Sequence, residues 1–199
     1  HNRGVDTFLA INDMLKDPSP QLRKKGLEEL SGNKFTVLNE KNLPTTLSLL
    51  GATMSDKDPD IQQIAFTTLL DFQFSSRFTG DKKVFRPLLH RGLQEKSEEV
   101  RSQNWHAFTT IIRMSGNESK DIFALFEGDD AVQFIKPYLE NNDPSVRREA
   151  IHYINESVRG RGRDERMNLV KLLKDRKDGR SETDVETLSK LNSALEDLE

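Results

Sequence analysis

The chain has 199 residues, and its 30 lysine and arginine residues nearly balance 33 aspartate and glutamate residues, so the formal net charge is −3. This balance is too even to imply a polyanion partner for the molecule as a whole. The absence of cysteine excludes disulfides, cysteine zinc ligands and a cysteine nucleophile. No apolar run approaches the roughly 18 residues of a membrane span, so no membrane partner is expected.

The chain starts at His1 rather than at methionine. It is therefore interpreted as a processed form, a fragment or a form with a tag remnant, from which any targeting signal could have been removed. No targeting segment is visible, and a cytoplasmic or nuclear location is expected.

One helical pattern recurs five times along the chain. Each copy has a short acidic or proline-containing turn, an aliphatic residue that we call the anchor, a polar or charged residue, and a helix. The anchors are spaced by 39, 39, 46 and 39 residues: Leu22, Ile61, Val100, Val146 and Val185. A period near 40 is typical of stacked helical hairpins. The hydrophobic content of 34% suits such an elongated array.

Bulky apolar residues follow the first four anchors at constant distances. Five residues after the anchor stand Leu27, Phe66, Trp105 and Ile151, and eight after it stand Leu30, Leu69, Phe108 and Ile154. Together with the anchor these positions form one face of a helix, so we expect them, Trp105 included, to be core residues. The fifth copy lacks bulky residues there, as a polar capping unit would.

The helix ahead of each turn also repeats. Leu43–Met54 opens with Pro44, whereas Pro87 and Pro137 lie inside the predicted helices Val84–Leu93 and Ala131–Leu139 and should bend them. No strand-like alternation occurs. The sequence therefore predicts one all-α domain over 1–199. Its approximate repeats are 5–32, 43–74, 84–114, 121–158 and 164–198.

These repeats resemble the HEAT and armadillo families over nearly the whole chain. The segment from Asp143 to Ala150 matches best, and a short apolar helix at Asp121–Phe126 resembles the extra helix of an armadillo unit. The resemblance implies a right-handed α-solenoid of about five hairpins. It also implies that Arg101 and Arg147, directly after their anchors, pair with an acidic turn residue of the next unit. Asp58 and Asp143 are suitable partners.

The candidate binding surface is the side of the second helices opposite the apolar face. Positions two, six and thirteen after the anchor lie there, and second helices usually line the concave surface of such arrays. The candidate residues are Gln63, Ser102, Gln103, His106, Arg113, Arg148, His152 and Arg159. The arginines would pair with carboxylates of a partner peptide or helix, and the others would form hydrogen bonds. His106 and His152 lack a third ligand, so no metal is expected.

A basic segment, Arg159–Arg180, supports an alternative. Its net charge of +5 precedes a net charge of −5 over 181–199. It could bind the phosphates of a nucleic acid through Arg159, Arg161, Arg163, Arg166, Lys171 and Lys174. Mutual neutralisation of the two segments is the favoured interpretation, and no aromatic residue is interleaved for base stacking.

No catalytic motif, phosphate loop or paired carboxylate in an apolar pocket occurs, so neither an enzyme, a cofactor nor a small-molecule substrate is expected. The preferred hypothesis is a protein–protein interaction scaffold or adaptor. The alternatives are nucleic-acid binding, an armadillo-type co-chaperone or a tubulin-binding array, and no motif selects either of the last two.

Overall fold

The computed structural model describes residues 3–114, 131–158 and 161–199, and these form two compact units, His1–Asn104 and Trp105–Glu199. Unit 1 holds α1 (Arg3–Leu15), α2 (Pro20–Gly32), α3 (Lys34–Val37), α4 (Leu43–Thr53), α5 (Pro59–Gln73), the 3-10 helix η1 (Lys82–Phe85), α6 (Arg86–Leu93) and the start of α7 (Glu98–Met114). Unit 2 holds the rest of α7, α9 (Ala131–Leu139), α10 (Pro144–Ser157), α11 (Arg163–Asp178) and α12 (Val185–Leu198). The described residues include no strand. The predicted helix Asp121–Phe126 lies outside them.

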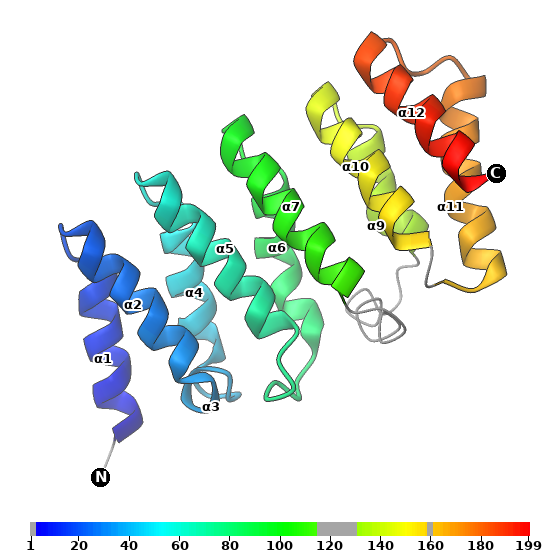
Figure 1. Ribbon diagram of the computed structural model, residues 1–199. Helices are drawn as coiled ribbons and strands as arrows, with labels where there is room; N and C mark the ends of the chain where they lie inside the picture. Colours follow the sequence, from blue (N-terminus) through cyan, green and yellow to red (C-terminus); the bar gives the residue numbers. More distant parts are fainter. Residues whose placement is uncertain (1–2, 115–130, 159–160) are drawn as a thin grey trace. The chain divides into compact units, whose positions relative to one another are not determined.

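Each unit is a stack of helical hairpins. In unit 1, α2 packs on α1 and α5 packs on α4, and the second helices α2 and α5 lie side by side (Figure 1). In unit 2, α10 packs on α9 and α12 packs on α11, while α10 contacts α12 and α9 contacts α11. The prediction of an all-α solenoid of helical hairpins is confirmed.

The apolar face of the second helices forms the core. Every bulky residue five or eight positions after the first four anchors is buried, and so are the anchors Ile61, Val100 and Val146. Trp105 is fully buried and packs edge-on against Tyr138 and Tyr153, with ring centroids 5.3 Å and 6.5 Å away. The prediction that Trp105 belongs to the core is confirmed. Leu22 differs from the other anchors because it is 41% exposed.

Two of the predicted turns cap the helices that follow them. The Asp58 side chain accepts a hydrogen bond from the Asp60 N–H, and Asp143 accepts one from Ser145, each at 2.9 Å. Ser19, by contrast, makes no capping bond from its side chain. A proline occupies the first turn after each of these cap positions, where its missing N–H costs nothing.

The prediction for Pro87 is wrong. The residues ahead of it form η1, and α6 begins at Arg86, so Pro87 lies in the first turn of α6 and bends no helix. This position suits proline because its ring fixes a helical φ and no hydrogen bond is lost. Pro137 lies inside α9, as predicted.

The fifth repeat is shifted by two residues relative to the prediction. Val185 is 83% exposed, whereas Thr187 is fully buried and stands three residues after the cap Asp184, as Val146 does after Asp143. The Asp184 carboxylate accepts hydrogen bonds from the N–H of Thr187 at 2.8 Å and from its hydroxyl at 2.6 Å. These bonds satisfy the hydroxyl and allow a polar residue to act as the anchor.

Candidate functional site

The predicted binding residues of unit 1 lie outside its core. Ser102 is exposed, and Gln63 and Gln103 are half-buried. Thr67, six residues after its anchor, is also exposed. The second helices of unit 1 therefore present a polar face with hydrogen-bonding groups.

The second helices of unit 2 present a comparable face. His106 on α7 is exposed, and Arg148 and His152 on α10 are half-buried. The side chain of Arg113 and the whole of Arg159 lie outside the described residues. The expectation that Arg113 and Arg159 pair with carboxylates of a partner protein therefore stays a prediction.

Arg148 is engaged within the chain rather than free for a partner. Its Nη1 lies 3.1 Å from Asp184 Oδ2, 3.2 Å from Thr187 Oγ1 and 3.7 Å from Glu186 Oε2. A partner carboxylate would therefore compete with groups at the start of α12. The prediction that Arg148 pairs with a carboxylate of a partner did not include these contacts within the chain.

Lys24 occupies the matching position of unit 1. Its Nζ lies 3.8 Å from Asp60 Oδ2, and Asp60 stands two residues after the cap of α5, as Glu186 does after the cap of α12. In α2 and α10, position two thus carries a cation that links this second helix to the start of the next one. Both pairs are partly exposed, so each contributes little to stability.

Four cations of the basic segment, Arg161, Lys171, Lys174 and Arg176, are paired with carboxylates. Lys171 lies 2.6 Å from Asp175, Lys174 lies 3.2 Å from Glu199, and the Arg166 guanidinium donates to the Leu198 carbonyl at 3.3 Å. Arg163 is exposed and has no hydrogen bond or ion pair among the described residues. The favoured prediction, neutralisation by the acidic segment, agrees with the Lys174–Glu199 pair and with the contacts of Glu182 described below.

Arg161 is unsuited to phosphate binding because its side chain is only 2% exposed. The guanidinium lies 3.3 Å from the Tyr153 hydroxyl and 3.4 Å from Glu165 Oε2. Burial raises the pKa of Tyr153 to about 12, so this hydroxyl stays protonated beside the cation. Arg161, one of the predicted phosphate ligands, is thus part of the interior of unit 2.

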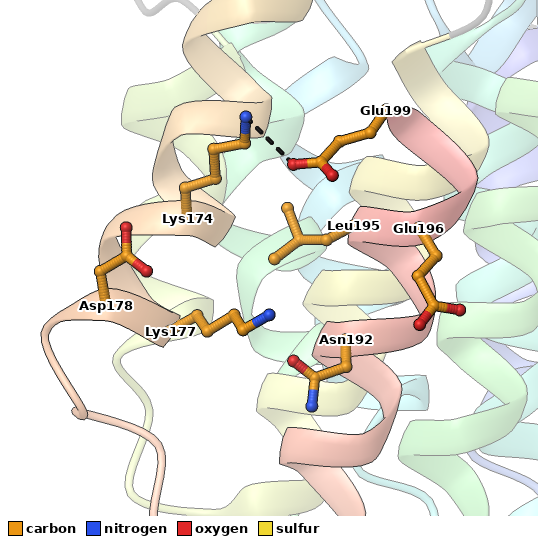
Figure 2. Close-up of a pocket in the computed structure, with 7 residues that line it drawn as sticks. All are labelled: Lys174, Lys177, Asp178, Asn192, Leu195, Glu196 and Glu199. Atoms are coloured by element: carbon orange, nitrogen blue, oxygen red, sulfur yellow. Dashed lines mark ion pairs between the residues drawn. The ribbon is translucent and has the colours of Figure 1, made fainter.

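A polar pocket of about 580 Å³ lies between α11 and α12. Figure 2 shows Lys174 directed toward Glu199 and Lys177 directed toward Asn192. The Asn192 side-chain oxygen is buried and has no hydrogen-bond partner among the residues that the structure describes. Asn192 stands five residues after Thr187, where the other second helices carry a bulky apolar residue. The pocket is therefore lined by groups of both charges and by one unsatisfied acceptor.

The residue after the anchor forms a buried link between hairpins. In unit 1, Arg23 Nε and Nη2 contact the two carboxylate oxygens of Asp56 at 2.8 Å and 3.2 Å. Its Nη1 donates to the carbonyls of Asp17 and Pro18, each at 2.9 Å. Because Asp56 is the partner and Asp58 caps α5, the expectation that Asp58 forms this link is wrong.

Arg147 repeats the same arrangement in unit 2. Nε and Nη2 contact the Glu182 carboxylate at 2.9 Å and 2.8 Å, and Nη1 donates to the carbonyls of Asn141 and Asn142 at 2.8 Å and 3.1 Å. Arg101 likewise donates to the carbonyl of Glu95 in its own turn, at 2.9 Å. Each carboxylate partner stands two residues before the cap of the next second helix: Asp56 precedes the cap Asp58, and Glu182 precedes the cap Asp184.

Glu182 also receives a third contact, because Arg176 Nε lies 3.0 Å from its Oε2. Burial raises the pKa of the Glu182 carboxyl, but the hydrogen bonds from Arg147 and Arg176 outweigh this effect, and the pKa lies below its usual value. Hydrogen bonds from Thr187 likewise lower the pKa of Asp184. The network therefore requires both carboxyls to be ionised.

These shifts predict how the stability of unit 2 depends on pH. The Glu182 pKa is lower in the folded than in the unfolded chain, so its contribution is complete above the unfolded value of about 4.3. It is lost as the pH falls through the folded value. We expect urea unfolding, followed by the fluorescence of the single tryptophan Trp105, to show this loss below about pH 4. A Glu182→Gln variant should show a flatter profile, and parallel profiles would contradict the assignment.

A buried arginine, set between the carbonyls of its own turn and an acid of the next hairpin, occurs in unit 1 and again in unit 2. This chain is built from repeated helical hairpins.

No family model matches the sequence, and no curated protein matches it. Among solved structures, a designed armadillo repeat protein in complex with the peptide (KR)4 is 19% identical, with a TM-score of 0.49, and covers 97% of this chain and 80% of its own. An engineered protein is 15% identical, with a TM-score of 0.45, and covers 97% of this chain and 96% of its own. At these scores the likeness says nothing about ligands.

The described residues contain no cluster of three or more histidine, cysteine or acidic side chains arranged to hold a metal ion. In the same ranges, no helix is both long and apolar enough to cross a bilayer.

Proposed function

We propose that this helical-repeat protein is an interaction scaffold that binds a peptide or helix of another protein along the exposed face of its second helices. One observation supports the proposal most directly. Positions two and six of the second helices bear polar side chains that the apolar packing of the hairpins does not use, in unit 1 and again in unit 2. Exposed and half-buried hydrogen-bonding groups at repeated positions suit recognition of a chain that runs across the helices.

The spacing of the helices suits such a ligand. Packed helices lie about 8–10 Å apart, and an extended chain advances about 3.3 Å per residue. Equivalent side chains on neighbouring second helices thus match every third residue of an extended peptide. Within unit 2, His152 on α10 and Ser193 on α12 occupy such equivalent positions, six residues after Val146 and Thr187.

Site-specific photo-crosslinking tests the proposal. A photoreactive amino acid is placed at Ser102 or His106 on the second-helix face, and at Ser48 of α4 or Lys136 of α9 as controls. All four residues are exposed, so the unit carrying each should stay folded. After irradiation in native lysate, the same partner protein should be joined to the Ser102 and His106 variants and not to the controls. Equal labelling of the first helices would overturn the assignment.

Nucleic-acid binding through Arg159–Arg180 is the second candidate, and exposed, unpaired Arg163 favours it. The same crosslinking is therefore repeated after nuclease treatment. A protein partner that persists supports the scaffold, whereas loss of the crosslink with nuclease transfers the function to the basic segment. Binding through that segment would also weaken steeply with salt.

A further inference from the structure

A groove runs along α11, the first helix of the last hairpin (Figure 1). Its volume is about 760 Å³, and it is bounded by α11, by the residues just before this helix and by the end of α12. Lining residues of α11 follow one another at steps of three or four residues: Arg163, Met167, Val170, Lys174 and Asp178. At 1.5 Å per residue they form one helical face about 22 Å long. We call this surface the α11 groove.

The middle of the α11 groove is apolar. Met167 is 57% exposed, and two further apolar lining residues, Val170 and Leu198, are half-buried. The apolar lining thus comes from both helices of the hairpin, since Leu198 belongs to α12. An apolar strip with charged residues on its rim is typical of a protein contact surface.

Cations outnumber acids in the lining of the α11 groove. The five cations are Arg161, Arg163, Arg166, Lys171 and Lys174, and the two acids are Asp175 and Asp178. Three of the cations are paired within the chain: Arg161 with Glu165, Lys171 with Asp175, and Lys174 with Glu199, the last pair being visible in Figure 2. Among the described residues, Arg163 and Arg166 form no ion pair, and neither does Asp178. A positive surplus therefore remains after the internal pairs are counted.

The unpaired charges lie at opposite ends of the groove. Arg163 and Arg166 stand in the first turn of α11, whereas Asp178 is its last residue and lies about 18 Å further along the helix than Arg166. The Arg166 guanidinium is held next to the apolar strip, because it donates to the Leu198 carbonyl at 3.3 Å. The acids of the first turn, Asp164 and Glu165, do not line the groove. The groove therefore has one positively charged end that adjoins its apolar middle.

We infer that the α11 groove docks an amphipathic helix of a partner protein that carries carboxylates at one end of its apolar face. Aliphatic side chains of that helix pack on Met167, Val170 and Leu198, and its carboxylates pair with Arg163 and Arg166. A helix suits the groove because the groove follows one helical face over about four turns. This inference does not depend on the proposed role of the second-helix face, since the two surfaces share no residue.

A nucleic acid would use the same two arginines but not the rest of the groove. Phosphates and sugars offer no apolar surface to cover the strip around Met167. No aromatic residue stands between 159 and 180 on which a base could stack. The apolar strip therefore favours a protein helix, and the test has to separate the two partners.

The test uses a fluorescein-labelled helical peptide of about 16 residues, which spans about 24 Å. Leucines form one face at three- and four-residue spacing, and glutamates flank them over the first two turns. Two reference peptides replace the glutamates by lysine or the leucines by serine. Fluorescence anisotropy with the full chain should show binding of the acidic amphipathic peptide only. Met167→Ala should weaken that binding about fivefold or more. Arg163→Glu should weaken it as well and reduce its dependence on salt.

Two matched variants in unit 1 separate the groove from general stickiness. Phe35→Ala removes an apolar side chain of 80% exposure on α3. Arg77→Glu reverses an exposed cation in the loop after α5 that forms no ion pair among the described residues. Both variants should bind the peptide as the parent chain does. The inference is overturned if they weaken binding as much as Met167→Ala, if the lysine peptide binds equally, or if the acidic peptide shows no binding at about 1 mM.

A labelled single strand of about 20 nucleotides separates a protein partner from a nucleic acid. The inference expects the strand to bind more weakly than the acidic peptide. It is overturned if the strand binds as tightly, and if Arg163→Glu weakens that binding while Met167→Ala does not. Met167→Ala should leave crosslinking at Ser102 and His106 unchanged, so failure here would not touch the scaffold proposal.

Discussion

Replacing Glu182 by alanine should lower the free energy of unfolding of unit 2 by about 3–5 kcal/mol. The Glu182 side chain is fully buried and accepts hydrogen bonds from Arg147 and Arg176. Its removal leaves the Arg147 guanidinium, 9% exposed, without its paired carboxylate. Urea unfolding at pH 7, followed by Trp105 fluorescence, measures the loss.

Glu199→Ala is the matched control for this variant. Glu199 forms a comparable ion pair with Lys174 at 3.2 Å, but its side chain is 61% exposed. Exposed pairs contribute less than about 1 kcal/mol. A Glu182→Ala variant as stable as Glu199→Ala would show that the buried arginine link does not stabilise the hairpins.

Gly92→Ala should destabilise unit 1 by about 1–3 kcal/mol or more. A Cβ at this position would lie 2.3 Å from Cδ2 and Cε2 of the buried Phe66 ring, and 3.3 Å from Met54 Cε. The ring is enclosed in the core and cannot rotate away freely. The Gly92 carbonyl also accepts a hydrogen bond from the buried Asn104 amide at 3.0 Å, so a shift of α6 would strain that bond.

Gly32→Ala provides the comparison, because a Cβ there would meet no atom within 4 Å. This change should be neutral or should stabilise the chain by up to about 1 kcal/mol, since alanine favours the helix. Urea unfolding followed by far-ultraviolet circular dichroism measures both variants. Similar stabilities for the two would contradict the close approach of α6 to Phe66.

The sequence was sufficient for the repeat and for most of the core. A period near 40 residues and an apolar face at helical spacing are local signals, and they placed Phe66, Trp105 and Ile151 correctly in the interior. The caps Asp58 and Asp143 were also predictable from local sequence, because an aspartate before proline offers a hydrogen-bond acceptor to the N–H groups of the first turn. Such patterns predict the fold well because local sequence preference and the packing of each hairpin agree.

Other features depend on contacts that the sequence pattern does not specify. Thr187 replaces Val185 as the buried anchor because Asp184 satisfies its hydroxyl, and a search for aliphatic anchors misses it. The partners of Arg148 and Arg23 depend on which turn residue reaches the guanidinium in three dimensions. Phe35 follows α2 in a short segment without periodicity, so the sequence pattern does not indicate its exposure.

The two contacts of Glu182 also bear on how unit 2 opens. Arg147 belongs to α10 and Arg176 to α11, and both bind one carboxylate in the connection that leads into α12. Detaching the last hairpin, α11 and α12, would therefore leave the buried Arg147 guanidinium of α10 without its carboxylate partner. A partial opening of this kind is penalised, so the backbone amides of α10 and α12 should become exposed in the same cooperative event rather than by fraying from α12 inward.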